Sequence, residues 1–97
     1  MSRVAGNVMN TRDELSEVLH RFRGLLQRST SRRAIVHLLL EGCTRKQIAL
    51  KLSRSQHTID AHLKIIYREV GIGDRARLML LATKLRDSGE LPPPRIG

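Results

Sequence analysis

Residues 44–70, which read TRKQIALKLSRSQHTIDAHLKIIYREV, decide the fold of this chain. Thr44 and Gln47 have the spacing of a capping box, and a short helical pattern follows them. Ser55 is the next candidate N-cap and predicts a longer helix that continues to about Val70. Two helices joined by so short a turn, with basic residues in the second, indicate a helix-turn-helix.

The longer helix divides into two faces when its residues are placed at intervals of about 100°. One face is apolar and suits a core: Ile59, Leu63, Ile66 and Val70. The opposite face carries small, hydrogen-bonding or cationic side chains: His57, Asp60, Ala61, Lys64 and Arg68. A reader of the DNA major groove needs this division, because base edges offer donors and acceptors and phosphates flank them. An ordinary amphipathic helix with a solvated face has the same division.

The pattern on either side of this pair is also helical, and no segment alternates in the manner of a β-strand. Before the pair, Thr30 can cap a helix that runs to Glu41 and ends at Gly42. After it, Asp74 can cap a last helix over residues 75–86. These patterns predict an all-α fold.

A further amphipathic helix precedes these elements. Thr11 and Glu14 have the spacing of another capping box, so Thr11 is the predicted N-cap. Helical spacing then continues to about Gln27 in an apolar stripe: Leu15, Val18, Leu19, Phe22, Leu25 and Leu26. Such a stripe must be covered, either by the rest of the chain or by the same helix of a second copy.

The charge of the chain indicates a polyanionic partner. Its 97 residues suffice for one small domain, and they include 18 Lys and Arg against 9 Asp and Glu, a formal net charge of +9. Most of that excess lies in residues 29–86. The only aromatic side chains are Phe22 and Tyr67, which argues against binding single strands by stacking their bases.

The remaining features predict a soluble cytoplasmic protein. The single cysteine, Cys43, cannot form an internal disulfide, and we expect it to act as a small core residue. No apolar run is long enough to span a membrane, and residues 1–7 lack the hydrophobic core of a signal peptide. Residues 87–97 contain three consecutive prolines and are predicted to form a flexible tail.

Short motifs run through residues 29–86 in a specific order: Thr30-x-Arg32-x-x-x-Val36, Glu41-Gly42-x-Thr44-x-Lys46-x-Ile48-Ala49-x-x-Leu52, Ser55-x-x-Thr58-Ile59-x-x-His62-x-x-x-Ile66-Tyr67, Val70-Gly71-Ile72 and Arg75-Ala76. In this combination the segment resembles the LuxR/GerE-type DNA-binding domain. The resemblance implies a four-helix bundle whose third helix enters the major groove, here preceded by one extra amphipathic helix in residues 1–28. It also implies a transcription regulator that binds DNA as a dimer, closest to the stand-alone small regulators of the family.

The same resemblance assigns roles to individual residues. Ser55 would cap the recognition helix, and Thr58 would offer its hydroxyl and the helix N-terminal amides to a phosphate. The candidates for base contacts are Asp60, Ala61 and Lys64. The candidates for clamping the DNA backbone are Lys46, Lys51, Arg54, His57 and Arg68. The alternative is that these basic residues only keep the protein in solution.

Two positions depart from the family pattern. Arg33 stands where the family usually has glutamate, and Asp60 stands where it often has lysine. A carboxylate that faces DNA is repelled by phosphate, although it can accept a hydrogen bond from N4 of cytosine.

The sequence offers two candidate helices for the dimer surface and does not decide between them. The candidates lie in the stripe of residues 1–28 and in the last helix: Leu15, Val18, Leu19, Phe22, Leu78, Leu81 and Leu85. Burying one leucine or phenylalanine contributes about 2 kcal/mol, so the stripe of six apolar residues could sustain a stable pair. The family resemblance implies that the last helix can form the dimer surface instead.

The expected function is sequence-specific binding of double-stranded DNA by a transcription regulator, with the helix of residues 55–70 reading an inverted repeat as a homodimer. The alternative is a protein-binding regulator that captures a related regulator; RNA polymerase is another candidate partner. No enzyme activity and no cofactor are expected, because the sequence offers no paired catalytic carboxylates and no phosphate-binding glycine loop. No metal site is expected either, since His57 and His62 diverge by about 140° on a helix.

Overall fold

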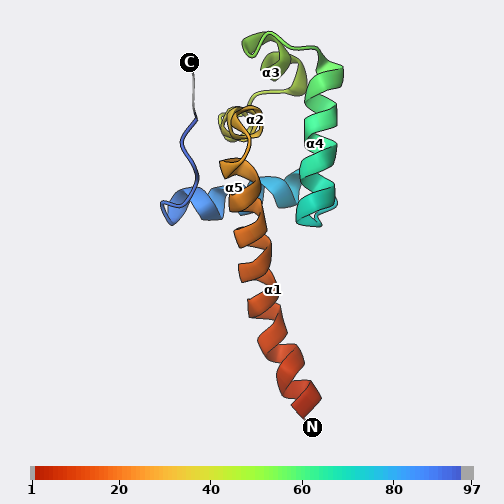
Figure 1. Cartoon of the computed structure of the whole chain (residues 1–97), viewed down its shortest axis with the longest axis vertical. Helices are drawn as coiled ribbons and strands as arrows, with labels where there is room; N and C mark the ends of the chain where they lie inside the picture. Colours follow the sequence, from red (N-terminus) through yellow and green to blue (C-terminus); the bar gives the residue numbers. More distant parts are fainter. Residues whose placement is uncertain (1, 95–97) are drawn as a thin grey trace.

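The computed structural model describes the backbone of residues 2–94 and the side chains of residues 14–94. The helices follow one another in the order α1 (Ser2–Gln27), α2 (Thr30–Leu40), α3 (Arg45–Lys51), α4 (Gln56–Val70) and α5 (Arg75–Asp87). This described part of the chain contains helices and no strand, which confirms the predicted all-α fold. In Figure 1, α2 to α5 form a bundle, and α1 enters it with its C-terminal half and extends away from it with its N-terminal half.

Local capping chemistry starts four of the helices. The side chains of Thr44, Ser55 and Asp74 accept hydrogen bonds from backbone N–H groups in the first turns of α3, α4 and α5, as the sequence predicts. Thr44 and Gln47 complete the reciprocal capping box. The cap of α2 is Ser29 and not Thr30, so this helix begins one residue earlier than predicted.

The start of α1 differs more from the prediction. The helix begins at Ser2, so Thr11 lies inside it and is not its N-cap. A capping box marks the start of a helix only where the residues before it leave the helical conformation. Residues 2–10 contain no proline and a single glycine, so nothing in them forces that departure. None of the described helices combines the length and the apolar composition that a membrane crossing requires.

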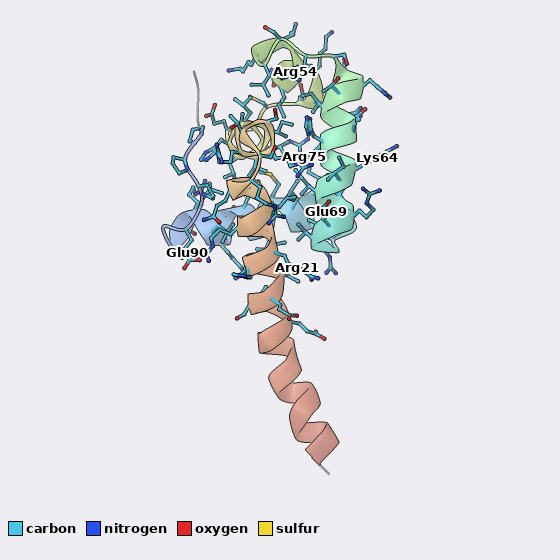
Figure 2. The ribbon with its side chains drawn as sticks, in the orientation of Figure 1. Arg21, Arg54, Lys64, Glu69, Arg75 and Glu90 are labelled. Atoms are coloured by element: carbon cyan, nitrogen blue, oxygen red, sulfur yellow. The ribbon has the colours of Figure 1, made fainter. Side chains whose placement is uncertain are left out.

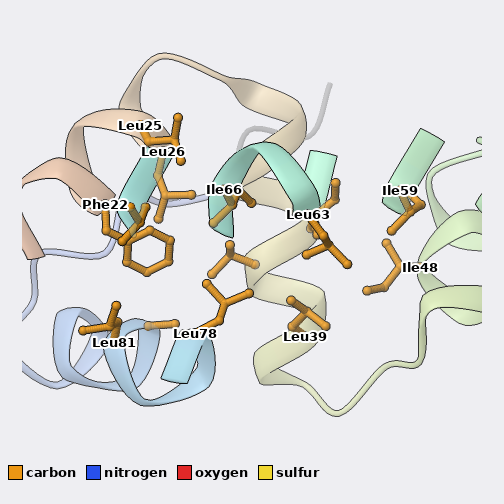
Figure 3. Packing of buried hydrophobic residues seen from close by; sticks show 14 of the residues in the cluster. Phe22, Leu25, Leu26, Leu39, Ile48, Ile59, Leu63, Ile66, Leu78 and Leu81 are labelled. Carbon is orange, nitrogen blue, oxygen red and sulfur yellow. The ribbon is translucent and has the colours of Figure 1, made fainter. Parts of the chain in front are cut away.

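One hydrophobic core joins all the helices (Figure 3). Phe22, Leu25 and Leu26 of α1 are at most 1% exposed and pack against residues from the other helices. Cys43 is buried, as expected. Three residues of the predicted dimer surface are at most 1% exposed and pack in the core of a single chain, so the prediction is wrong for them: Phe22, Leu78 and Leu85. Leu81 is 5% exposed and lines a hollow of the surface together with Leu15 and Val18.

Arg33 has a structural role that explains its departure from the family pattern. Its Nη1 donates to the carbonyl oxygens of Leu26 at 3.0 Å and Gln27 at 2.9 Å, and its Nη2 donates to Thr30 Oγ1 at 3.1 Å. The carbonyls at the C-terminus of a helix lack intrahelical partners and carry partial negative charge. The guanidinium therefore caps the C-terminus of α1 and links this helix to α2.

The segment after α5 is held against the bundle, at least as far as residue 92. His37 Nε2 donates a hydrogen bond to the carbonyl oxygen of Pro92 at 2.7 Å, and Leu91 packs on the core. Glu90 lies 3.5 Å from Arg23 of α1. The prediction of a flexible tail over residues 87–97 is thus wrong for its first part, because these contacts anchor it; residues 95–97 lie outside the described residues.

Candidate nucleic-acid interface

A tight turn sets α4 against α3. Ser53 has a φ of +55°, in the left-handed region that favours glycine, and the N–H of Arg54 donates to the carbonyl oxygen of Ala49 at 2.9 Å. Ile48 of α3 and Ile59 of α4 are both fully buried and face each other in Figure 3. This apolar contact and the closed turn fix the direction of α4 relative to α3.

The two predicted faces of α4 are confirmed. Its apolar residues are buried in the core: Ile59, Leu63, Ile66 and Val70. On the other face, Asp60 is half-buried and the rest of the predicted set is exposed: His57, Ala61, Lys64 and Arg68. The helix therefore rests on the bundle with one side and presents a mixed polar and cationic side to solvent.

A hollow of about 530 Å³ opens along one flank of this exposed face. It is lined by the predicted contact residues His57, Asp60, Ala61 and Lys64, together with side chains from other helices. Two of those are arginines that sequence reasoning missed, Arg45 from α3 and Arg75 from α5. Figure 2 shows Lys64 and Arg75 in this part of the molecule.

Arg45 forms an ion pair with Asp60, at 2.7 Å between Nη1 and Oδ1. Asp60 is therefore not an isolated acid on the exposed face of α4, because a cation from α3 balances its charge. Arg75 donates from Nη2 to the carbonyl oxygen of Cys43 at 3.2 Å, which holds this side chain beside the start of α3. Fifteen residues separate Arg45 from Asp60, so no local pattern in the sequence could have revealed the pair.

A second hollow, of about 280 Å³, lies on the other flank of α4. It is lined by Lys51 and Arg54, which sequence reasoning assigned to the DNA backbone, and by His62. Hydroxyl groups from the first turn of α2 complete its polar lining, namely Thr30 and Ser31. Among the described residues that line it, none is acidic.

His62 lies at the wall of this second hollow in an electropositive environment. Burial, followed by the charges of Arg32 and Arg54, lowers the pKa of His62 from its usual value of 6.5. Its Nδ1 is buried and has no hydrogen-bond partner among the described residues. His57 lines the first hollow and His62 the second, in agreement with the predicted divergence of their side chains.

Some of the predicted contact residues lie outside both hollows. Two of them, Lys46 and Arg68, are exposed but line neither hollow. Ser55 and Thr58 lie at the N-terminus of α4, where their hydroxyl oxygens are 3.0 Å apart. The exposed face of α4 thus has a cation-lined hollow on each flank. A helix that enters the major groove runs between two phosphate backbones, so this arrangement is compatible with duplex DNA.

Comparison with protein families gives a match that agrees with this geometry. The family described as "Bacterial regulatory proteins, luxR family" matches residues 29–82, from the N-cap of α2 into α5, which is more than half of the chain. Comparisons with curated proteins and with solved structures found no match. The helix α1 lies outside the matched segment. The chain therefore belongs to the luxR family of bacterial regulatory proteins and is a DNA-binding transcription regulator with a helix-turn-helix domain.

Proposed function

We propose that this regulator recognises a specific sequence in double-stranded DNA by inserting α4 into the major groove, with two copies bound to an inverted repeat. The observation that carries the proposal is the exposed face of α4 with a cation-lined hollow on each flank. Base contacts come from Asp60, Ala61 and Lys64, which lie on that face. Such a regulator acts in the cytoplasm, where bacterial DNA lies, and no catalytic step is part of the proposal.

Cations around α4 bind the phosphates on both sides of the groove. Lys51 and Arg54 act on one flank, beside the second hollow. His57 and the newly found Arg75 act on the other, beside the first hollow. Lys46 and Arg68, which lie outside both hollows, extend the contact to neighbouring phosphates. Each neutralised phosphate releases counterions, so these contacts supply affinity that falls with salt.

Two copies are needed because one recognition helix reads only a few base pairs, too few to select sites in a genome. A two-fold dimer doubles the length that is read and requires half-sites about one helical turn apart. The capture of a related regulator is the alternative, and the small size of the chain and the acid at position 60 favour it, because an isolated carboxylate repels phosphate. The pairing of Asp60 with Arg45 weakens the second of these arguments, since the charge of Asp60 is balanced.

Selection of bound duplexes from a random library tests the proposal. We expect the selected duplexes to share an inverted repeat and the affinity to fall steeply as salt increases. Lys64→Ala should weaken binding to the selected site about tenfold and change random DNA much less, because Lys64 contacts bases. Lys51→Ala should weaken both alike and reduce the salt slope by about one.

Lys84→Ala is the matched control, because Lys84 is an exposed lysine in the last turn of α5 that lines neither hollow. It should leave both the affinity and the salt slope unchanged. Selection of no common sequence, or an affinity that is equal at low and high salt, would contradict the proposed mode of binding.

A further inference from the structure

The second hollow, of about 280 Å³, has the lining of a small anion site. Its cations come from Lys51 at the end of α3 and from Arg54 in the turn before α4, which Figure 2 shows at this edge of the bundle. No acidic side chain is among the described residues that line it. Sites for whole small molecules occupy about 300–1,000 Å³, so this hollow suits a single small group.

Hydroxyl groups add donors to these cations. Thr30 and Ser31 line the hollow from the first turn of α2, and Ser53 lines it from the turn after α3. Thr30 Oγ1 accepts a hydrogen bond from Arg33 Nη2, which leaves the O–H of Thr30 free to donate. Cations and hydroxyl donors from three parts of the chain suit an anion with several oxygens, such as a phosphate group.

His62 brings a titratable group to the same hollow. Burial and the charges of Arg32 and Arg54 lower the pKa of its ring below the usual value of 6.5, so the ring is mostly neutral at pH 7. Its Nδ1 is buried without a hydrogen-bond partner among the described residues. A neutral ring that lies among cations gains a proton more readily when a negative charge enters the hollow.

We propose that the second hollow holds one phosphate group of the DNA backbone and that its binding takes up a proton from solvent, which is held on the ring of His62. The inference rests on the proposed function, because DNA on α4 brings the phosphate to this flank, and it adds a contact and a proton. An imidazolium ring has an N–H on both nitrogens, so protonated His62 can donate to a phosphate oxygen. Such a charged hydrogen bond is about twice as strong as a neutral one.

The proton gives the affinity for DNA a defined dependence on pH. The phosphate offsets the charges of Arg32 and Arg54, so the pKa of His62 is higher in the complex than in the free chain. Below the pKa of the free chain, His62 is protonated in both states and the affinity is greatest. The affinity falls as the pH rises through the pKa of the complex, because the ring then loses its charge while the phosphate is bound.

Titration of the histidine rings by NMR tests the proton directly. The full chain has four histidines, and comparison with the spectrum of His62→Gln identifies the resonances of His62. When a duplex of random sequence binds at constant ionic strength, the pKa of His62 should rise. The pKa of His20, which is exposed on α1, should stay unchanged. An unchanged pKa of His62 in the complex would overturn the inference.

The affinity for random duplex between about pH 5.5 and about pH 8 measures the consequence. The chains carry His57→Gln, because His57 lines the first hollow on the other flank of α4. Their affinity should be about fivefold greater at the acid end, which is the difference between a charged and a neutral hydrogen bond.

Addition of His62→Gln should abolish this difference, whereas addition of His20→Gln, the matched control, should leave it. Circular dichroism over the same pH range shows whether each chain is folded. Identical pH profiles with and without His62 would contradict the uptake of a proton at this ring.

Ser31→Ala tests the phosphate site apart from the proton. The change removes one hydroxyl donor and keeps Ser29 as the N-cap, so α2 should remain folded. The affinity for random duplex should fall about threefold. Ser16→Ala, at an exposed position of α1, is the control and should bind like the parent. A Ser31→Ala variant that binds like the parent would overturn the placement of the phosphate in this hollow.

Inorganic phosphate separates the DNA backbone from a free anion. It is titrated into the free chain against chloride of equal ionic strength, and the pKa of His62 is followed. We expect a smaller rise than with the duplex, because a free phosphate lacks the neighbouring contacts that hold the DNA backbone. A rise with inorganic phosphate and none with the duplex would assign the hollow to a free anion and overturn the inference.

The outcomes also separate this inference from the proposed function, because random duplex requires no reading of bases. Affinity for random DNA that depends on the proton of His62, together with selection of no common sequence, would support the phosphate site and overturn sequence-specific reading alone. Selection of an inverted repeat by a chain in which DNA leaves the pKa of His62 unchanged would overturn the phosphate site alone.

Discussion

Arg45 and Asp60 connect the first turn of α3 to α4 through an ion pair of 2.7 Å. Both side chains are partly exposed, so the pair contributes little to stability. Its importance is electrostatic, because it neutralises an acid on the surface that we propose meets DNA. It also withholds Arg45 from phosphate for as long as the pair persists.

The first prediction concerns this pair. Asp60→Ala should raise the affinity for random DNA, relax the base preference and steepen the salt dependence by about one unit of slope, because a base contact is lost and Arg45 becomes available to a phosphate. Arg45→Ala should lower the affinity, since it leaves Asp60 unbalanced beside the duplex. Titrations at several salt concentrations measure both effects. The double variant should show that the two changes are not additive, and an unaltered salt slope in Asp60→Ala would contradict the release of Arg45.

The second prediction concerns pH. The pKa of His62 is lowered in the folded chain, so the unfolded chain binds this proton more tightly and acid favours unfolding. The stability contribution is fully present above the usual value of 6.5 and is lost as the pH falls below it. His62→Gln should remove this part of the decline in urea unfolding free energy between about pH 7 and about pH 5.

His20→Gln provides the control for the pH measurement, because His20 is an exposed histidine of α1. The control should retain the parent's decline in stability. If His62→Gln declined as steeply as His20→Gln, His62 would titrate alike in the folded and unfolded chains.

The third prediction separates the two halves of the α1 stripe. Phe22 is fully buried, so Phe22→Ala should lower the free energy of unfolding by about 3–5 kcal/mol. Leu15 is 41% exposed, so Leu15→Ala should change it by only about 0.5 kcal/mol at low protein concentration. Urea denaturation followed by circular dichroism measures both. Equal losses in the two variants would contradict the division of the stripe between core and surface.

The fourth prediction concerns the cap on α1. Arg33→Gln removes the charged donor from the carbonyls of Leu26 and Gln27, so it should lower the free energy of unfolding by about 1 kcal/mol. Arg21→Gln, at an exposed position of α1, should have almost no effect. Thermal unfolding of both variants measures the difference. An Arg33→Gln variant as stable as the Arg21→Gln control would show that the cap contributes nothing.

The sequence by itself determined the features that depend on neighbouring residues. The caps at Thr44, Ser55 and Asp74 follow from hydrogen bonds that span three residues, so their chemistry can be read locally. The buried and exposed faces of α4 follow from helical periodicity. The family resemblance added the expectation that α4 reads DNA, and the match over residues 29–82 confirms the family itself.

Only the tertiary structure decided which distant residues meet. It paired Asp60 with Arg45 across two helices, and it assigned Phe22 to the core while leaving Leu15 exposed on the same stripe. It also anchored Pro92 to His37, in a segment whose prolines suggested a free tail. Helical periodicity indicates that an apolar face must be covered, but it does not indicate which part of the chain covers it. The partner of a face is set by how whole helices pack, and that packing depends on side chains far apart in the sequence.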